Sequence, residues 1–178
     1  MTVVTRTTRE TRVRAELRPE GDSSVATTVP FLDHMLMTFS RYSGIAMRIS
    51  ADGDLLHHIV EDTAIVIGKA IAASTPTTCA RYADRTIPMD DALVQCAIDL
   101  GGRAYYDGRL PSNLYEHWMR SFADNAGATL HIRVLRGRDR HHIVEAAFKA
   151  LGLCVRDALH IEAEVFSTKG AASLETIA

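Results

Sequence analysis

Cysteine is scarce in this 178-residue sequence, and no long hydrophobic run is present. The most apolar stretch, residues 64–73, is interrupted by Lys69 and is too short to cross a bilayer, so we expect no membrane partner. An odd set of widely spaced cysteines does not suit a disulfide framework, and we therefore expect reduced thiols and a cytoplasmic location. The three cysteines are Cys79, Cys96 and Cys154.

An excess of charge of one sign is also missing. Lysine and arginine number 20 against 22 aspartates and glutamates, which gives a formal net charge of -2. A broad basic surface of the kind that binds nucleic acid is therefore not expected. The first residues alternate polar and charged side chains without an apolar segment, so no signal peptide is expected. No linker rich in proline or glycine divides the chain, and we expect a single domain over residues 1–178.

One pentapeptide, His-His-Ile-Val-Glu, occurs twice, beginning at His57 and at His141. From these doublets onward, six of fifteen aligned positions are identical, and they include Gly68 with Gly152. A globular core does not need adjacent histidines, so a doublet that recurs in both halves is hard to attribute to packing. Internal similarity of this kind indicates a duplicated fold.

The similarity also extends upstream of each doublet, where residues 31–44 align with residues 114–127. Each half therefore supplies one lone histidine, then a histidine doublet, then a glutamate. The aligned pairs are Asp33 with Glu116, His34 with His117, Phe39 with Phe122 and Gly44 with Gly127.

Periodicity and turn residues predict an α+β fold made of two similar halves, about residues 1–84 and 85–178. Each half is expected to form a small, mostly antiparallel sheet with two helices on one face, so that the helices pack between the sheets. A turn at residues 19–22 predicts that the strands 3–17 and 24–29 form a hairpin. The other expected strands are 45–50, 85–89, 92–99, 103–107 and 128–135, and the expected helices are 30–41, 57–73, 113–123 and 141–159.

The spacing of the pentapeptide predicts a pair of metal ions. On a helix, His57 and Glu61 are about 40° apart around the axis and can bind one ion, whereas His58 points about 100° away from His57. His58 must then serve a different ion or partner. Imidazole and carboxylate together suit Mn, Fe, Co, Ni or Zn, and four protein ligands on each six-coordinate ion would leave open positions for catalysis. The eight candidate ligands are His34, His57, His58, Glu61, His117, His141, His142 and Glu145.

A plainer explanation exists for each doublet taken alone. Surface histidines are common, and a glutamate four residues after a histidine often forms a solvated pair. The repetition of the whole set in both halves favours metal binding. A metal that is structural, with no reaction catalysed, stays open at this point.

Six blocks of the sequence resemble the imidazoleglycerol-phosphate dehydratase family, in the family's order. They are FLDHML (31–36), HHIVEDTAIVIG (57–68), PMDDAL (88–93), EHWMRSF (116–122), HHIVEAAFKALG (141–152) and STKG (167–170). The resemblance implies a duplicated fold like domain 2 of ribosomal protein S5, and the same eight metal ligands. It also implies two Mn²⁺ ions per active site and a homo-oligomeric shell of about 24 subunits with active sites between subunits.

The family reaction converts imidazole glycerol phosphate into imidazole acetol phosphate and water in histidine biosynthesis. The metal would act as a Lewis acid on the imidazole ring rather than as an activator of water, and a further group must move protons. The resemblance assigns catalytic roles to Glu10, His58 and His142. Alternation predicts that Glu10 shares a strand face with Arg12 and Arg14.

The substrate phosphate needs cations and hydrogen-bond donors. Resemblance implies that Glu10 also contacts the substrate, together with a set of basic and hydroxyl side chains. These residues are Arg81, Arg103, Lys149, Ser167, Thr168 and Lys169.

The chain departs from the family pattern at two places. Leu55 and Leu56 stand where an acidic pair commonly precedes the first doublet, and the preceding segment is about three residues short. Tyr42 stands where the family has a histidine, whose substrate contact would be replaced by Tyr42 or lost.

Three functions are therefore distinguished. The matched blocks favour a dimanganese lyase over a binuclear metallohydrolase that would cleave a phosphate ester. The phosphate-binding candidates favour either enzyme over a metal-binding shell protein without catalysis.

Overall fold

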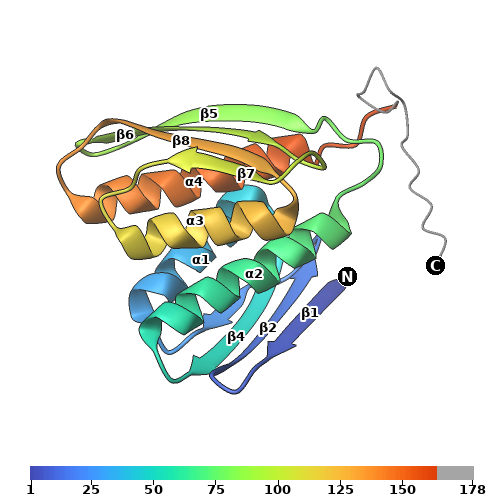
Figure 1. The fold of residues 1–178 in the computed structure, drawn as a ribbon. Helices are drawn as coiled ribbons and strands as arrows, with labels where there is room; N and C mark the ends of the chain where they lie inside the picture. The colour runs from blue at the N-terminus through green and yellow to red at the C-terminus, as the bar shows by residue number, and fades with distance from the viewer. Residues whose placement is uncertain (164–178) are drawn as a thin grey trace.

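Each half of the chain folds into a four-stranded sheet and two helices, and the helices lie between the two sheets (Figure 1). The computed structural model describes residues 1–163. The first half consists of β1 (Thr2–Thr7), β2 (Thr11–Arg18), β3 (Ser24–Ala26), α1 (Pro30–Ser43), β4 (Ala46–Gly53) and α2 (Leu56–Ser74). The second half consists of β5 (Tyr82–Met89), β6 (Ala92–Asp99), β7 (Tyr105–Gly108), α3 (Asn113–Ala126), β8 (Thr129–Arg136) and α4 (Arg140–Ala158).

The two sheets have the same topology. Their strand orders are β1-β2-β4-β3 and β5-β6-β8-β7. In each sheet the first three strands pair antiparallel, and the short last strand runs parallel to its neighbour. The predicted duplication, with helices between two mostly antiparallel sheets, is therefore confirmed.

Alternation along the strands gives each sheet one buried face. In β2, Val13, Ala15 and Leu17 are buried, whereas the intervening Arg12 and Arg14 are exposed. The buried side chains join the core beneath the helices, as expected for a sheet covered on one side. All three cysteines are buried free thiols. No helix of the described part of the chain combines the length and apolarity needed to cross a membrane.

The helices cross between the halves, with α2 against α3 and α1 against α4. The repeated glycines lie at these crossings. A Cβ atom on Gly68 would lie 2.7 Å from the carbonyl oxygen of Phe122, and one on Gly152 would lie 3.0 Å from the carbonyl oxygen of Phe39. Because glycine has no Cβ, the two helix backbones can approach closely at both places. The sequence repeat therefore corresponds to a repeated helix crossing.

The N-terminal strand prediction is wrong in two respects. Residues 3–17 do not form one strand, because a turn at residues 8–10 separates β1 from β2, which pair as a hairpin. The Thr8 hydroxyl accepts the backbone N–H groups of Glu10 and Thr11 at 3.1 and 2.9 Å, which stabilises this turn. β3 also does not pair with β2. Both edges of β2 are already occupied by β1 and β4, so β3 adds in parallel to β4.

Candidate metal centres and active site

Two groups of three candidate ligands form in the folded chain, and each group combines residues from both halves. The first contains His57 and Glu61 from α2 and His117 from α3, and their ligand atoms lie within 4.8 Å of one another. The Nε2 atoms of His57 and His117 are 3.7 and 3.3 Å from the two carboxylate oxygens of Glu61. The two imidazole rings stack with centres 5.0 Å apart.

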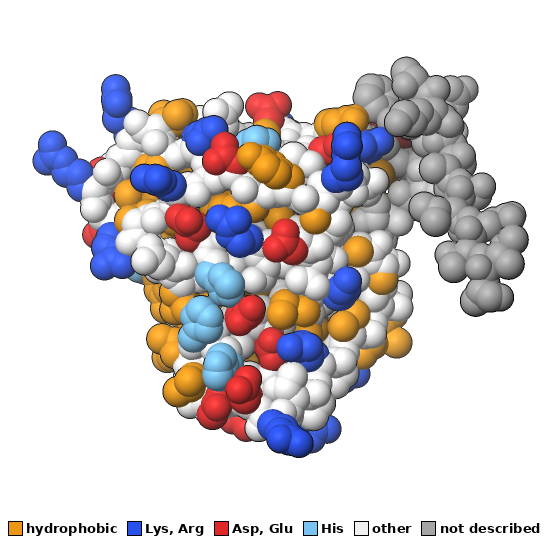
Figure 2. Space-filling model, viewed as in Figure 1, with side chains coloured by type: hydrophobic (Ala, Val, Ile, Leu, Met, Phe, Trp, Pro, Cys, Tyr) orange, Lys and Arg blue, Asp and Glu red, His pale blue; other side chains and the backbone are white. Residues whose placement is uncertain are grey.

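The second group is the counterpart of the first. It contains His141 and Glu145 from α4 and His34 from α1. One oxygen of Glu145 lies 3.0 Å from His141 Nε2 and 3.2 Å from His34 Nε2. Each crossing of α2 with α3, or of α4 with α1, therefore completes one group. Figure 2 shows histidine side chains gathered beside acidic ones on the molecular surface.

The lone histidines are positioned by the acids that precede them. Asp33 accepts the backbone N–H of Thr27 at 2.8 Å, and Glu116 accepts that of Leu110 at 3.0 Å. Each bond ties the start of α1 or α3 to the loop before it. The aligned pair Asp33 and Glu116 thus has the same structural role in both halves.

The second histidine of each doublet turns away from these groups, as the helical spacing predicts. The ring centres of His57 and His58 are 6.2 Å apart and their planes are inclined by 72°. Those of His141 and His142 are 6.0 Å apart and inclined by 83°. Neither His58 nor His142 belongs to a three-ligand group among residues 1–163.

Two aspartates hold the second histidine of each doublet. The Nδ1 atom of His58 is 2.8 Å from Asp54 Oδ1, and that of His142 is 2.8 Å from Asp91 Oδ1. Each bond raises the pKa of its histidine. The same bonds lower the pKa of both aspartates, to about 2 for Asp91, which also accepts two backbone N–H groups. Asp90 lies on the other side of His142, with Oδ2 3.4 Å from Nε2.

The donor set fits a divalent transition ion. The buried Nε2 of His117 makes no hydrogen bond within the described chain and lies 3.3 Å from the Glu61 carboxylate, as a ligand atom of an ion between them would. In the other group, burial raises the pKa of Glu145, but ion pairs with Lys149 and His34 outweigh burial and leave the pKa lowered. An ionised carboxylate with imidazoles suits Mn, Fe, Co, Ni or Zn.

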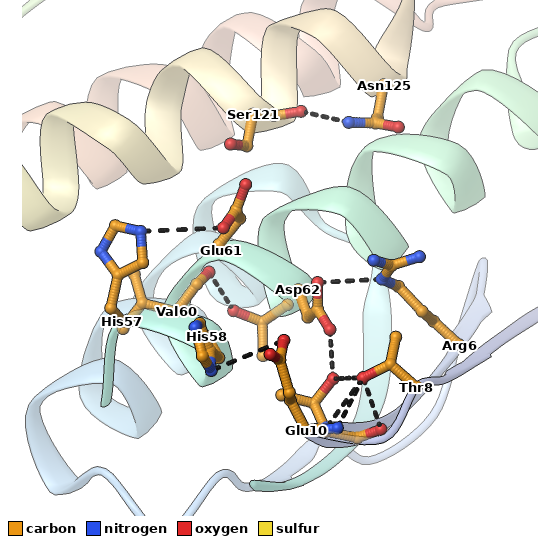
Figure 3. Close-up of polar contacts among 12 residues, drawn as sticks. Arg6, Thr8, Glu10, His57, His58, Val60, Glu61, Asp62, Ser121 and Asn125 are labelled. Carbon is orange, nitrogen blue, oxygen red and sulfur yellow. Dashed lines mark hydrogen bonds and ion pairs between the residues drawn. The ribbon is translucent and has the colours of Figure 1, made fainter. Parts of the chain in front are cut away.

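Glu10 lies near His58, but not where the alternation pattern predicted (Figure 3). It belongs to the turn between β1 and β2, rather than to the strand face that carries Arg12 and Arg14. Its Oε2 is 3.8 Å from Nδ1 of His58. The structure therefore brings the expected acid–base carboxylate next to His58, the second histidine of the first doublet.

The turn that carries Glu10 is tied to α2. The buried Asp62, next to Glu61, accepts a 2.9 Å bond from Arg6 (Figure 3). It also accepts a bond from the Thr11 hydroxyl. The backbone N–H of Asp54 also donates to the carbonyl oxygen of Glu10 at 3.0 Å. These contacts fix the position of Glu10 relative to the helix that carries the first doublet.

Lys149 is the one predicted phosphate-binding residue that the described structure places at a metal group. Its ammonium is 3.0 Å from Glu145 and lies 5.7 Å above the ring of Tyr42. Both side chains line a cavity of about 630 Å³ together with His34 and Arg41. Tyr42, which departs from the family pattern, thus lies beside the second group.

The two predicted arginines lie at the other end of the molecule. The backbone N–H of Arg81 donates to Ala158, the last residue of α4, and its guanidinium binds Asp99 at 2.6 Å. Arg103 is exposed in the loop that follows β6. Since α4 has 19 residues and is about 28 Å long, neither arginine reaches the groups at the helix starts of its own chain. Ser167, Thr168 and Lys169 lie outside the described residues.

Comparisons with known proteins identify the family of the chain. Residues 27–155 match the family model for imidazoleglycerol-phosphate dehydratase. The chain is 44% identical to the dehydratase of Chlorobaculum tepidum, covering 93% of this chain and 95% of that one. It is also 44% identical to the dehydratase of Pyrobaculum calidifontis, covering 93% and 96%.

Solved structures show the same fold. The crystal structure of the Pyrococcus furiosus dehydratase superposes with a TM-score of 0.88 at 37% identity and covers 95% of this chain and all (100%) of the other. The Staphylococcus aureus dehydratase superposes with a TM-score of 0.83 at 32% identity, covering 90% and 99%. With a paired histidine motif, a duplicated fold and these relatives, the chain belongs to the imidazoleglycerol-phosphate dehydratase family of hydro-lyases.

Proposed function

We propose that this protein dehydrates imidazole glycerol phosphate to imidazole acetol phosphate in histidine biosynthesis, with two Mn²⁺ ions in each active site. The observation that carries the proposal is the pair of three-ligand groups in a member of this family. His57, Glu61 and His117 would hold one ion, and His34, His141 and Glu145 the other. We expect the reaction to take place in the cytoplasm.

When bound, the ions supply Lewis acidity and a template that orients the imidazole ring. The hydroxyl on the carbon attached to the ring must leave as water, and a proton must leave the next carbon. The enol that results becomes the ketone. Glu10 is our candidate for moving these protons, because its carboxylate is ionisable and lies 3.8 Å from His58. Lys149, in the cavity beside the second group, would contribute to binding the phosphate.

A complete site needs more than one copy of the chain. Each group has three ligands, while His58 and His142 turn away from both groups of their own chain and would complete the ions of neighbouring copies. Arg81 and Arg103 would likewise approach the site from another copy, together with Ser167, Thr168 and Lys169. We therefore propose a homo-oligomeric shell of about 24 single-domain subunits with active sites between them.

Exposed leucines support contact at the start of α2. Leu55 and Leu56 precede the first doublet and are 55% and 52% exposed in the single chain. Apolar side chains beside a shared metal site are expected to be covered when copies assemble.

The test is to incubate the Mn²⁺-loaded protein with imidazole glycerol phosphate and to measure ketone and free phosphate together. Ketone without phosphate is the expected result. Phosphate release would instead support a binuclear metallohydrolase. The absence of both products would support a shell protein without catalysis. Either of these outcomes would refute the proposal.

A further inference from the structure

His58 and His142 share one arrangement of hydrogen bonds. In both, Nδ1 lies 2.8 Å from a carboxylate oxygen, from Asp54 in one half and Asp91 in the other. An ionised carboxylate can only accept, so Nδ1 must donate its proton in both pairs. In the neutral ring, Nε2 then carries the free lone pair. The second histidine of each doublet therefore presents Nε2 as its possible metal-binding atom, and in His142 this atom also lies 3.4 Å from Asp90 Oδ2.

The two halves reach this arrangement from positions that are not equivalent in the repeat. Asp54 precedes α2 and lies four residues before His58. The position of Asp54 in the repeat corresponds to Arg138 in the second half. Asp91 instead comes from the turn between β5 and β6, 51 residues before His142. The repeat alone thus does not account for the two carboxylates, whereas a shared requirement of the two histidines does.

The departure at Leu55 and Leu56 gives Asp54 a particular importance. Both leucine side chains are apolar and about half exposed, so neither can hold an imidazole by a hydrogen bond. Asp54 is the nearest acid before the doublet, and its carboxylate reaches His58 Nδ1 at 2.8 Å, closer than the 3.8 Å of Glu10. The shortened segment therefore keeps one acid within reach of the helix start.

We propose that Asp54 and Asp91 are positioning residues that fix the ring orientation and the Nδ1–H tautomer of His58 and His142, so that Nε2 binds an ion shared with a neighbouring copy. Carboxylate partners of this kind orient metal-binding histidines and raise their basicity, and their removal typically lowers metal affinity about 10–100-fold. The proposal rests on the proposed function, because it takes the two histidines as ligands. Beyond that function, the proposal identifies Asp54 and Asp91 as the residues that make Nε2 the metal-binding atom of the two histidines.

Asp54 offers the cleaner test, because its side chain is half exposed and outside the core. Mn²⁺ affinity is measured from the free-ion signal in electron paramagnetic resonance, during titration of the metal-free protein. Asp54→Ala is expected to weaken Mn²⁺ binding about 10–100-fold. Asp54→Asn keeps an accepting oxygen and is expected to lose less. Asp52→Ala, two residues away and exposed, is the matched control and should bind like the wild type.

Asp91 needs a gentler change, since it also accepts the backbone N–H groups of Arg138 and Asp139 at 2.6 and 3.1 Å. Asp91→Asn keeps an accepting oxygen at this turn, and its far-ultraviolet circular dichroism should match that of the wild type if the helices are intact. Weakened Mn²⁺ binding is expected, with Asp84→Asn on the same hairpin as the control.

Two readouts separate this inference from the proposed function. Wild-type Mn²⁺ binding and ketone formation test the function. If the wild type is active while Asp54→Ala and Asp91→Asn bind Mn²⁺ with unchanged affinity, the positioning role is refuted and the function stands. If the wild type binds Mn²⁺ without forming ketone, the function fails, and weaker binding by both variants would still support the positioning role.

Discussion

Mixing two inactive variants should restore activity if His57 and His58 serve sites in different copies. His57→Ala breaks one three-ligand group, and His58→Ala removes a candidate ligand outside these groups while leaving both groups intact. Each variant alone is expected to be inactive. Coexpression of the two variants in equal amounts would produce mixed shells. In these shells a chain with an intact His57 can lie beside a chain with an intact His58.

The expected recovery of activity follows from the fraction of sites that contain both an intact His57 and an intact His58. A working site needs one intact His57 and one intact His58, and each is intact in half of the copies. If they come from different copies in a random assembly, about one half times one half, or about a quarter, of the sites are complete. If both came from one copy, no mixed site would be complete.

A matched control comes from the same group. The rings of His57 and His117 stack with centres 5.0 Å apart in one chain, so His57→Ala mixed with His117→Ala leaves every group broken. This second mixture should show no recovery. The assay is ketone formation per chain, with both variants carrying different tags to verify mixed shells. No recovery from the first mixture, in verified mixed shells, would refute the shared site.

Three further outcomes are expected. Gly68→Ala should lower the free energy of unfolding by about 1–2 kcal/mol in denaturant titrations, because the added methyl group meets the Phe122 carbonyl oxygen. This clash outweighs the better helix propensity of alanine. An unchanged midpoint of denaturant unfolding would contradict the close helix crossing. Burial raises the pKa of Glu16, but the ion pairs with Arg18 and Arg14 outweigh burial and leave the pKa lowered. The stability that the ionised Glu16 contributes is therefore present above the usual glutamate pKa of 4.5 and is lost as the pH falls below it. Glu16→Gln should therefore be less stable than the wild type at pH 7 and approach it in acid, and a difference that does not depend on pH would contradict this reasoning. Removal of metal with EDTA should abolish ketone formation but leave the far-ultraviolet circular dichroism of the helices unchanged, since no residue of the metal groups belongs to the hydrophobic core. Loss of helix signal would contradict that reasoning.

Much of the fold could be predicted because the chain repeats itself. The duplication could be predicted from the doublets, the lone histidines and the glycine pairs. The two sheets could be predicted from the alternation of apolar and polar residues. The N-terminal hairpin could not be found in the same way. Residues 5–12 are all polar or charged, so no apolar alternation locates the turn, whereas the Thr8 hydroxyl, which accepts the backbone N–H groups of Glu10 and Thr11, marks the break. The parallel pairing of β3 also depends on which strand edges are free, and local sequence does not contain that information.

The candidate ligands were predictable because helical geometry separates adjacent side chains by about 100°. That rule places His57 with Glu61 and sends His58 elsewhere, as the structure shows. The partner of each group was not predictable, since the meeting of His117 with α2 depends on tertiary packing. Asp54 and Asp91 were also missed. The spacing of Asp54, four residues before His58, was the available signal, whereas no local spacing links Asp91 with its histidine.

The most direct test of the central claim is a diffraction experiment on the Mn²⁺-loaded, assembled protein at the manganese absorption edge. Two anomalous peaks are expected per chain, one at the group of His57, Glu61 and His117 and one at the group of His34, His141 and Glu145. Each ion should carry a further Nε2 ligand from His58 or His142 of a neighbouring copy. Ions bound by residues of one chain alone, or no ion at these groups, would contradict metal sites that are shared between copies.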